Sequence, residues 1–359
     1  MSNTKTDTGR KSRASVRARL ATTALGAAAM AGMMAVATPS FAEVTLNVNS
    51  WAGPTYPLAT QTVELCEDIA EVTEGRVVCN ILPKAVASPT QTFDAVASGI
   101  VDIGYIVHGY TAGRFVLTKA VEFPLFGDTA ETMSVAYQRV YDKMLASGNE
   151  HEGVKVLAVH THGPGQMFNI RREIKSLGDL NGLKMRVGGG VINDVSEAIG
   201  VVPILKPATE VYELLSSGVA DGVFFAKDGV VPYNLPEVVK FATFVPGGMY
   251  NISFGWLANP DKWNSIPEAD RALIEPLIGE NLARSIGKKF DTADQVAIKA
   301  LEDAGIPMST ADEQFVSDLA STTEPLRAAW IKQASDMGLD GQAVLDALQE
   351  AIKEVEAGN

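Results

Sequence analysis

The sequence predicts an α/β protein built from two similar domains, and three observations support this fold class. Short β-rich runs alternate with helical patterns throughout residues 43–359, as they do in domains with parallel sheets. A unit made of a short helix, a Ser-Gly pair and an Asp before a strand occurs twice in the chain. A helical pattern then covers residues 267–304, which at 1.5 Å per residue would reach about 57 Å, longer than one domain is wide. We therefore expect the long helix to span both domains.

The periodicity assigns each element in chain order. Strands are expected at 44–51 and 76–82 around a helix at 58–73, then strands at 154–161, 184–187, 201–205, 241–245 and 252–258 with a helix at 191–199, and late helices at 267–304, 311–337 and 342–356. Pro276, Gly279 and Gly287 interrupt the long helical pattern, so we expect a kink or break at one of them.

The repeated unit has a physical reason for its residue types. It reads Ser98-Gly99 followed by Asp102, and later Ser217-Gly218 followed by Asp221. Glycine after a helix adopts a left-handed conformation at little cost, and an Asp side chain can accept hydrogen bonds from the turn backbone before the strand. Two copies, 119 residues apart, indicate two similarly built domains.

Residues 1–42 differ from the remainder in charge and hydropathy. They hold six basic residues and one acidic residue, with the basic region at 10–19 followed by an apolar run at 20–37. The segment Pro-Ser-Phe-Ala ends at Ala42 with a small residue. This order is typical of a secretory signal, so we expect export and cleavage after Ala42. An uncleaved membrane anchor is the alternative.

The rest of the chain is strongly acidic. Residues 43–359 carry 24 basic and 42 acidic residues, a net charge of −18. Phosphate backbones and anionic lipid would be repelled by such a surface, which argues against nucleic-acid binding. An anionic ligand would need a local cation to overcome this field.

The two cysteines are predicted to form a disulfide. Cys66 lies in the expected helix at 58–73 and Cys79 in the strand that follows it. A helix packed on the next strand can bring two such positions within bridging distance, and export favours oxidation. Two buried free thiols are the alternative, and a zinc site without nearby histidine is improbable.

Sequence motifs for enzymes, cofactors and metals are weak. The chain has no phosphate-binding loop of the Walker type, and the glycines at 188–190 lack the spacing of a dinucleotide site. His160 and His162 share a strand face, but histidines at the rim of a polar cleft are commoner than a metal pair. We predict no enzyme activity, no cofactor and no metal.

Arg186 is the most sharply placed cation. It shares a strand face with Lys184, at the end of a short strand after an acid-led turn. A guanidinium beside a domain cleft can bind a carboxylate through two parallel hydrogen bonds. A salt bridge to a local acid is the alternative.

The surrounding stretch resembles a known family. Ile174-x-Ser176-x-x-Asp179-Leu180-x-Gly182-Leu183-Lys184-x-Arg186-Val187 is similar to the signature of solute receptors of tripartite ATP-independent periplasmic (TRAP) transporters, as are the paired Gly-x-x-Asp units, the signal segment and the long helix. The resemblance implies a two-lobed periplasmic-binding-protein fold with crossing strands and a long helix spanning both lobes. It also implies that Arg186 pairs with a substrate carboxylate, and that the partner is a membrane transporter of a small and a large subunit driven by sodium.

The resemblance also suggests boundaries and a ligand class. We expect a first lobe of residues 43–163 plus about 250–289, and a second of 164–249 plus about 290–359. Gln166 stands where sialic-acid-type members have a second Arg, and Val223-Phe224-Phe225 replaces a polar residue found in many members. Since an unpartnered buried polar group costs about 1–3 kcal/mol, a sugar acid should fit badly. We predict a small monocarboxylate with an apolar or aromatic body.

Further ligand contacts are expected at strand ends, where ligands bind in open α/β sheets. The candidates are Trp51, Tyr56, Tyr105, His108, Tyr110, Gln166 and Phe225. His108 is the candidate for a second polar contact, and Phe224 should point away from Phe225. Arg114 is expected to bridge the lobes or cap a loop. For each aromatic residue, a place in the lobe core is the alternative.

Three rival functions remain open. A receptor of an ATP-driven importer would share the lobes and signal but lack the signature at 174–187. A periplasmic enzyme acting on a small acid would need a nucleophile or acid–base pair. A structural or regulatory partner protein would not be stabilised by small molecules.

Overall fold

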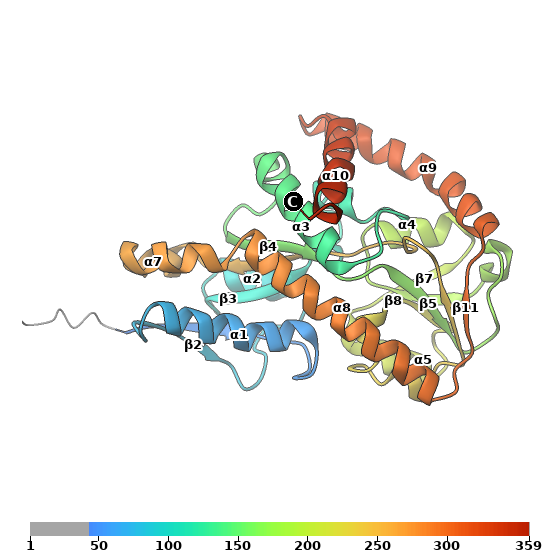
Figure 1. The fold of residues 1–359 in the computed structure, drawn as a ribbon, viewed down its shortest axis with the longest axis horizontal. Helices are drawn as coiled ribbons and strands as arrows, with labels where there is room; N and C mark the ends of the chain where they lie inside the picture. Colours follow the sequence, from blue (N-terminus) through green and yellow to red (C-terminus); the bar gives the residue numbers. More distant parts are fainter. Residues whose placement is uncertain (1–42, 359) are drawn as a thin grey trace, which may run out of the picture. The chain divides into compact units, whose positions relative to one another are not determined.

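Two β-sheets with helices packed on them make up the part of the chain described in the computed structural model, residues 43–358 (Figure 1). The first sheet has the strand order β2-β1-β3-β10-β4, and the second has the order β11-β9-β5-β8-β6-β7. The predicted signal segment and its cleavage site lie outside the described residues.

The observed elements follow the predicted ones closely. The strands are β1 Val44–Asn49, β2 Val77–Ile81, β3 Ile103–Val107, β4 Lys155–Thr161, β5 Gly165–Asn169, β6 Lys184–Val187, β7 Val202–Leu205, β8 Gly222–Ala226, β9 Phe241–Phe244, β10 Ser253–Ala258 and β11 Met308–Thr310. The helices are α1 Pro57–Val72, α2 Thr92–Ala97, α3 Ala130–Lys143, α4 Val191–Ala198, α5 Val211–Ser216, α6 Pro260–Ser265, α7 Glu268–Ile274, α8 Glu280–Asp303, α9 Glu313–Asp336 and α10 Gly341–Glu356.

The two sheets are built by the same sequence of steps. In the first, β1 pairs in parallel with β2 and β3, and in the second β6 pairs in parallel with β7 and β8. An antiparallel strand then lies beside each third strand, β10 beside β3 and β5 beside β8. Since β5 follows β4 of the first sheet and β10 follows β9 of the second, the chain crosses between lobes at these strands. The predicted two-lobed α/β fold with crossing strands is confirmed.

The repeated Gly-x-x-Asp units occupy corresponding places in the two lobes. The first lies between α2 and β3, and the second lies between α5 and β8. Gly99 and Gly218 have φ values of 73° and 72°, the left-handed region in which glycine is favoured. Asp102 accepts a hydrogen bond of 2.7 Å from the backbone N–H of Asn47 in β1. Asp221 accepts one of 2.9 Å from the backbone N–H of Lys184 in β6. Each carboxylate therefore holds a neighbouring parallel strand, within β1 in the first lobe and at the first residue of β6 in the second.

The long helical pattern breaks where one glycine allows it. Gly279 has φ 63° and separates α7 and a short 3₁₀ turn from α8. At 1.5 Å per residue the 24 residues of α8 extend about 36 Å. Helix α8 packs on α1 and α3 of the first lobe and on the turn at Lys227–Gly229 of the second (Figure 1). The predicted helix spanning both lobes is therefore present, in shortened form.

The last two helices pack on different partners. Helix α9 runs beside α4, whereas α10 lies against α3 (Figure 1). The C-terminal helices thus contact elements of both lobes rather than the second lobe alone.

The predicted disulfide is confirmed. Cys66 of α1 and Cys79 of β2 are bonded, with their Cα atoms 5.4 Å apart. The helix packs on the strand that follows it, which places the two positions face to face. Among residues 43–358, no helix combines the length and apolar character needed to span a bilayer.

Candidate functional site

A cavity of about 30 Å³ lies between the two sheets, where strands of both lobes end. Its walls come from the first lobe, the second lobe and the crossing segments. The lining residues are Trp51, Tyr56, Val107, Tyr110, His162, Arg186, Ala208, Phe225, Ala226, Asp228, Tyr250, Ile252 and Phe254. Five of the eight predicted ligand contacts are therefore brought together here: Arg186, Phe225, Trp51, Tyr56 and Tyr110.

Arg186 is a buried cation at the edge of this cavity. It lies in β6 and is only 2% exposed. Its Nε donates a hydrogen bond of 2.8 Å to the carbonyl of Lys206, and its guanidinium carbon lies 5.3 Å from the Phe225 ring centroid. In the described part of the chain, no carboxylate lies within ion-pair distance of it. A buried charge without a counter-charge is destabilising by several kcal/mol in general.

Tyr110 links the two lobes beside this cation. It belongs to a 3₁₀ turn, His108–Tyr110, that follows β3 of the first lobe. Its hydroxyl oxygen accepts hydrogen bonds from Arg186 Nη2 at 3.3 Å and from the backbone N–H of Ala208 at 2.8 Å. Because both donors belong to the second lobe, Tyr110 contributes to closure as well as to the cavity wall.

The rest of the wall is largely aromatic. Trp51 lies 4.9 Å from Tyr105 and 6.4 Å from Tyr110, measured between ring centroids. On the opposite side, the ring of Phe225 lies 5.4 Å from that of Tyr233. Phe224 belongs to the main core and does not line the cavity, as strand alternation predicts.

Three predicted contacts, Tyr105, Gln166 and His108, lie outside the cavity wall. Their polar atoms are hydrogen-bonded to other groups of the protein. The Tyr105 hydroxyl bonds Ser50 Oγ at 2.9 Å and the N–H of Ala52 at 3.1 Å. The Gln166 amide exchanges two hydrogen bonds with the backbone of Val245. Tyr105 and Gln166 do not line the cavity. The geometry of the cavity therefore gives no support to their assignment as ligand contacts.

His108 is the third of these residues. Its Nδ1 lies 3.0 Å from Ser253 Oγ, and its Nε2 lies 2.8 Å from His151 Nε2. Burial, and then the neighbouring His151, hold the pKa of His108 well below its usual range. The ring is therefore neutral and part of a buried network. Arg114 also stays within the first lobe, with its guanidinium 3.5 Å from the Phe93 ring centroid.

The histidine pair is buried and uncharged. The His160 ring stacks on Phe254 with centroids 4.7 Å apart, and burial lowers its pKa to about 3. His162 lines the cavity, and burial lowers its pKa to about 4 although its bond to the Gly163 carbonyl raises it. Neither ring adds a cation near neutral pH. Residues 43–358 bring no three His, Cys, Asp or Glu side chains into a metal-binding group.

Sequence reasoning missed the cavity residues that arrive from distant segments. Tyr250, Ile252 and Phe254 precede or begin β10, which crosses back to the first sheet. Asp228 was also missed, although it follows the strand of the second Gly-x-x-Asp unit. Asp228 comes three residues after Phe225, which was itself a predicted contact, and this short separation was the available signal.

A buried carboxylate, Glu122, makes a second contact between the lobes besides that of the Tyr110 hydroxyl. Glu122 of the first lobe accepts a 2.9 Å hydrogen bond from the N–H of Val191, the first residue of α4 in the second lobe. It also accepts one from the hydroxyl of Ser253. Burial raises the pKa of Glu122, while these hydrogen bonds oppose the increase.

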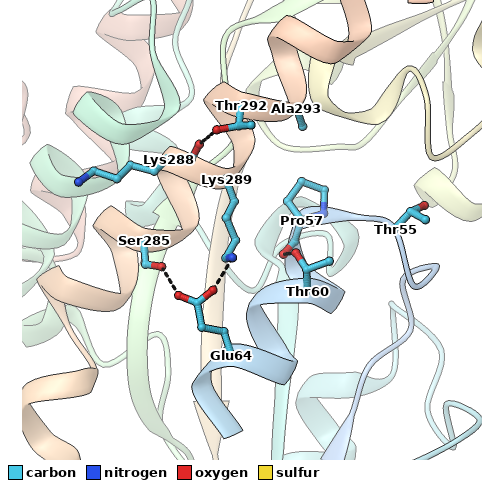
Figure 2. Close-up of a pocket in the computed structure, with 9 residues that line it drawn as sticks. All are labelled: Thr55, Pro57, Thr60, Glu64, Ser285, Lys288, Lys289, Thr292 and Ala293. Atoms are coloured by element: carbon cyan, nitrogen blue, oxygen red, sulfur yellow. Dashed lines mark hydrogen bonds and ion pairs between the residues drawn. The ribbon is translucent and has the colours of Figure 1, made fainter. Parts of the chain in front are cut away.

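A larger groove of about 510 Å³ lies between α1 and α8, away from the predicted residues (Figure 2). Glu64 pairs there with Lys289 and receives a hydrogen bond from Ser285. Glu64 and Lys289 are thus engaged with each other, Lys288 pairs with Glu131 outside the groove, and none of the predicted ligand contacts lines it.

The site and fold agree with a family assignment. Residues 48–333 match the family model DctP, described as bacterial extracellular solute-binding protein, family 7. The chain belongs to this family. Its members are solute-binding receptors, and TRAP receptors bind small organic acids and work with membrane transporter components.

Individual relatives cover most of the chain. A TRAP solute-binding protein from Bordetella bronchiseptica, solved with (R)- and (S)-mandelate, is 40% identical with a TM-score of 0.85, covering 87% of this chain and 99% of its own. A marine metagenome TRAP protein, described as specific for aromatic acids and solved with 3-hydroxybenzoate, is 31% identical with a TM-score of 0.82, covering 87% and 99%. The outer membrane transporter protein TsaT of Comamonas testosteroni is 31% identical over 84% of this chain and 90% of its own.

Proposed function

We propose that this chain is a periplasmic receptor that captures a small aromatic monocarboxylic acid and delivers it to a TRAP membrane transporter. The transporter would consist of a small and a large subunit and be driven by a sodium gradient. The two similar structures that hold mandelate and 3-hydroxybenzoate support the aromatic class. In this proposal residues 1–42 direct export and are removed, and the receptor releases its acid chemically unchanged.

The observation that carries the proposal is the isolated cation in the cavity wall. Arg186 is buried, and within residues 43–358 no carboxylate pairs with it. A ligand carboxylate would supply the missing counter-charge, and a guanidinium can bind it through two parallel hydrogen bonds. Because this charge is dehydrated, the pair should be stronger than an ion pair at the surface.

The remaining wall favours a planar, apolar body. Trp51 and Phe225 lie on the cavity together with Tyr250 and Phe254. Aromatic side chains bury a large apolar area and pack well against other rings. A polyhydroxylated sugar acid would leave most of its hydroxyl groups without partners here, which costs about 1–3 kcal/mol for each buried group.

Ligand entry requires the lobes to separate. The cavity of about 30 Å³ is far smaller than the several hundred Å³ typical of ligand sites. Tyr110 and Glu122 hold the lobes together through bonds to Ala208 and Val191. In this proposal the acid enters an open state and then favours closure through contacts that both lobes make with it.

Calorimetric titration of the purified receptor tests the proposal. Benzoate and mandelate should bind, whereas glucuronate should bind at least tenfold more weakly. At 100 times its dissociation constant a ligand should stabilise the fold by about 2.7 kcal/mol. Arg186→Met should weaken binding of the aromatic acids by about 100-fold, because it keeps an unbranched apolar stem and removes the guanidinium charge.

Arg172→Met is the matched control, since Arg172 is exposed and its Nε bonds the carbonyl of Asp179 outside the cavity. It should bind as the wild type does. If Arg186→Met retained wild-type affinity, Arg186 would not be the anchor. Conversion of a bound acid to a product, followed by proton NMR, would favour the enzyme alternative instead.

A further inference from the structure

Asp228 is a buried acid in the cavity wall with an unused oxygen. It is 2% exposed and lies in the 3₁₀ turn Lys227–Gly229 directly after β8. It lines the same cavity as Arg186 and Phe225. Its Oδ2 is fully buried and forms no hydrogen bond with any described residue. Buried polar atoms are nearly always hydrogen-bonded, so an unpartnered carboxylate oxygen on a residue that lines the cavity points to a ligand group as its partner.

The surroundings of Asp228 favour its neutral form. Burial raises its pKa well above the usual range, the nearby carboxylate of Asp294 raises it further, and the nearby Tyr56 hydroxyl opposes the rise. A neutral carboxyl group both donates and accepts hydrogen bonds. It also does not repel the carboxylate of an acid bound nearby at Arg186.

The cavity therefore offers two different polar sites. Arg186 offers a full positive charge, which suits a carboxylate. In its protonated form, which burial favours, Asp228 offers one donor and one acceptor without charge, and this suits a hydroxyl group, itself both a donor and an acceptor. An ammonium group is a poor match because the wall already contains the Arg186 cation.

We propose that Asp228 hydrogen-bonds a hydroxyl group of the ligand, so that the receptor selects hydroxylated aromatic monocarboxylic acids over the same acids without the hydroxyl. This inference rests on the proposed function, and it adds a specificity-determining residue and a narrower substrate class to it.

Two pairs of acids isolate the hydroxyl group. Mandelate differs from phenylacetate by one hydroxyl on the side chain, and 3-hydroxybenzoate differs from benzoate by one on the ring. Calorimetric titration of the wild-type receptor should show the hydroxylated member of at least one pair binding tenfold or more tightly. The ratio within a pair is the measured quantity, because it cancels general effects on folding or closure.

Variants then assign the preference to Asp228. Asp228→Val should bring the preferred pair's ratio to about one, because it removes the hydrogen-bonding partner of the hydroxyl group. Asp228→Asn should keep part of the preference, because an amide also donates and accepts. Asp270→Asn is the matched control: Asp270 is 3% exposed and pairs with Arg76 outside the cavity, so this variant should keep the wild-type ratio.

The outcomes separate the two proposals. Equal affinities within both pairs for the wild-type receptor, or an unchanged ratio in Asp228→Val, would overturn the role of Asp228 and leave the proposed function standing. Failure of the wild-type receptor to bind any of the four acids would instead overturn the proposed function. If Asp228→Val did not fold, the ratios of the wild type and of Asp228→Asn would decide, since a ratio in Asp228→Asn equal to that of Asp270→Asn contradicts the assignment.

Discussion

Asn49 and Arg186 occupy the same place in the two lobes and perform different tasks there. Asn49 of β1 lies opposite Gly104 of β3, and Arg186 of β6 lies opposite Val223 of β8. Gly104 and Val223 each stand two residues after the Asp of a Gly-x-x-Asp unit. The two side chains are therefore equivalent by strand register.

Both side chains hold the backbone that follows the outer strand. Asn49 Oδ1 accepts hydrogen bonds from the N–H groups of Val86 and Ala87, and its Nδ2 donates to the Ala87 carbonyl. Arg186 holds the corresponding backbone with Nε alone, which donates a hydrogen bond to the carbonyl of Lys206. Its longer side chain carries the remaining donors to the cavity. One position in a shared fold thus serves stability in the first lobe and charge recognition in the second.

The turns after β3 and β8 differ in a similar way. Gly109 and Asp228 are the middle residues of corresponding 3₁₀ turns. A Cβ at Gly109 would lie 2.8 Å from backbone atoms of Gly189 and Gly190, so the first turn allows the lobes to meet closely. The second turn places an acid in the cavity instead. Closure and ligand chemistry are therefore divided between equivalent turns.

The largest expected effect concerns the disulfide, which is a feature of the first lobe only. It joins α1 to β2, whereas the corresponding α4 and β7 contain no cysteine. Replacing both Cys66 and Cys79 with Ser should lower the free energy of unfolding by about 3 kcal/mol, since the closed loop is short. Urea unfolding measures this loss, and ligand affinity should stay within twofold of wild type. A loss below about 1 kcal/mol would show that packing, without the disulfide, is enough to hold α1 against the edge strand β2.

Asn49→Ala tests the stabilising half of the comparison. It would leave the buried N–H groups of Val86 and Ala87 without acceptors, so we expect a loss of about 2 kcal/mol in unfolding free energy. Asn80→Ala is the control, because Asn80 lies on the neighbouring strand but is exposed. Equal effects of the two variants would contradict the special role of the Asn49 position.

The sequence was sufficient for features that depend on local patterns. Periodicity and the Gly-Asp units predict both lobes, and the break at Gly279 follows from its backbone freedom. Arg186 was recognisable because its signature is continuous in the chain. Tyr250 and Phe254 were not, since the crossing of β10 decides where they lie. Gln166 was wrongly predicted as a ligand contact because its amide bonds Val245, which directly follows β9 and is far from Gln166 in the sequence.

Gly109→Ala tests the closing half of the comparison. The added methyl group would contact the backbone at 188–190, so the closed state should become less favourable while each lobe keeps its fold. We expect ligand affinity to fall about tenfold, equivalent to about 1.4 kcal/mol, with little change in thermal stability without ligand. Gly53→Ala, where a Cβ would meet nothing within 4 Å, should bind normally. Normal binding by Gly109→Ala would show that ligand binding does not need this contact.

The smallest expected effect is a pH dependence at Asp221, the second-lobe acid of the repeated unit. Partial burial raises its pKa, but the N–H of Lys184 and the guanidinium of Arg171 outweigh this and hold the pKa below its usual range. Since a lowered pKa stabilises the folded state above the unfolded value, this contribution is present at neutral pH. It is lost as the pH falls from about 5 through the folded pKa.

Asp221→Asn should therefore cost on the order of 1 kcal/mol at pH 7, and the difference from wild type should shrink towards pH 3. Urea unfolding at a series of pH values measures both quantities. Arg171→Gln removes the ion pair of 2.6 Å but leaves the bond from Lys184, so it should cause a smaller loss with the same sign. A difference between wild type and Asp221→Asn that grew at low pH would mean that Asp221 is stabilised in its protonated form. The Asp of the second unit would then hold its strand by a different interaction from the one that the structure shows.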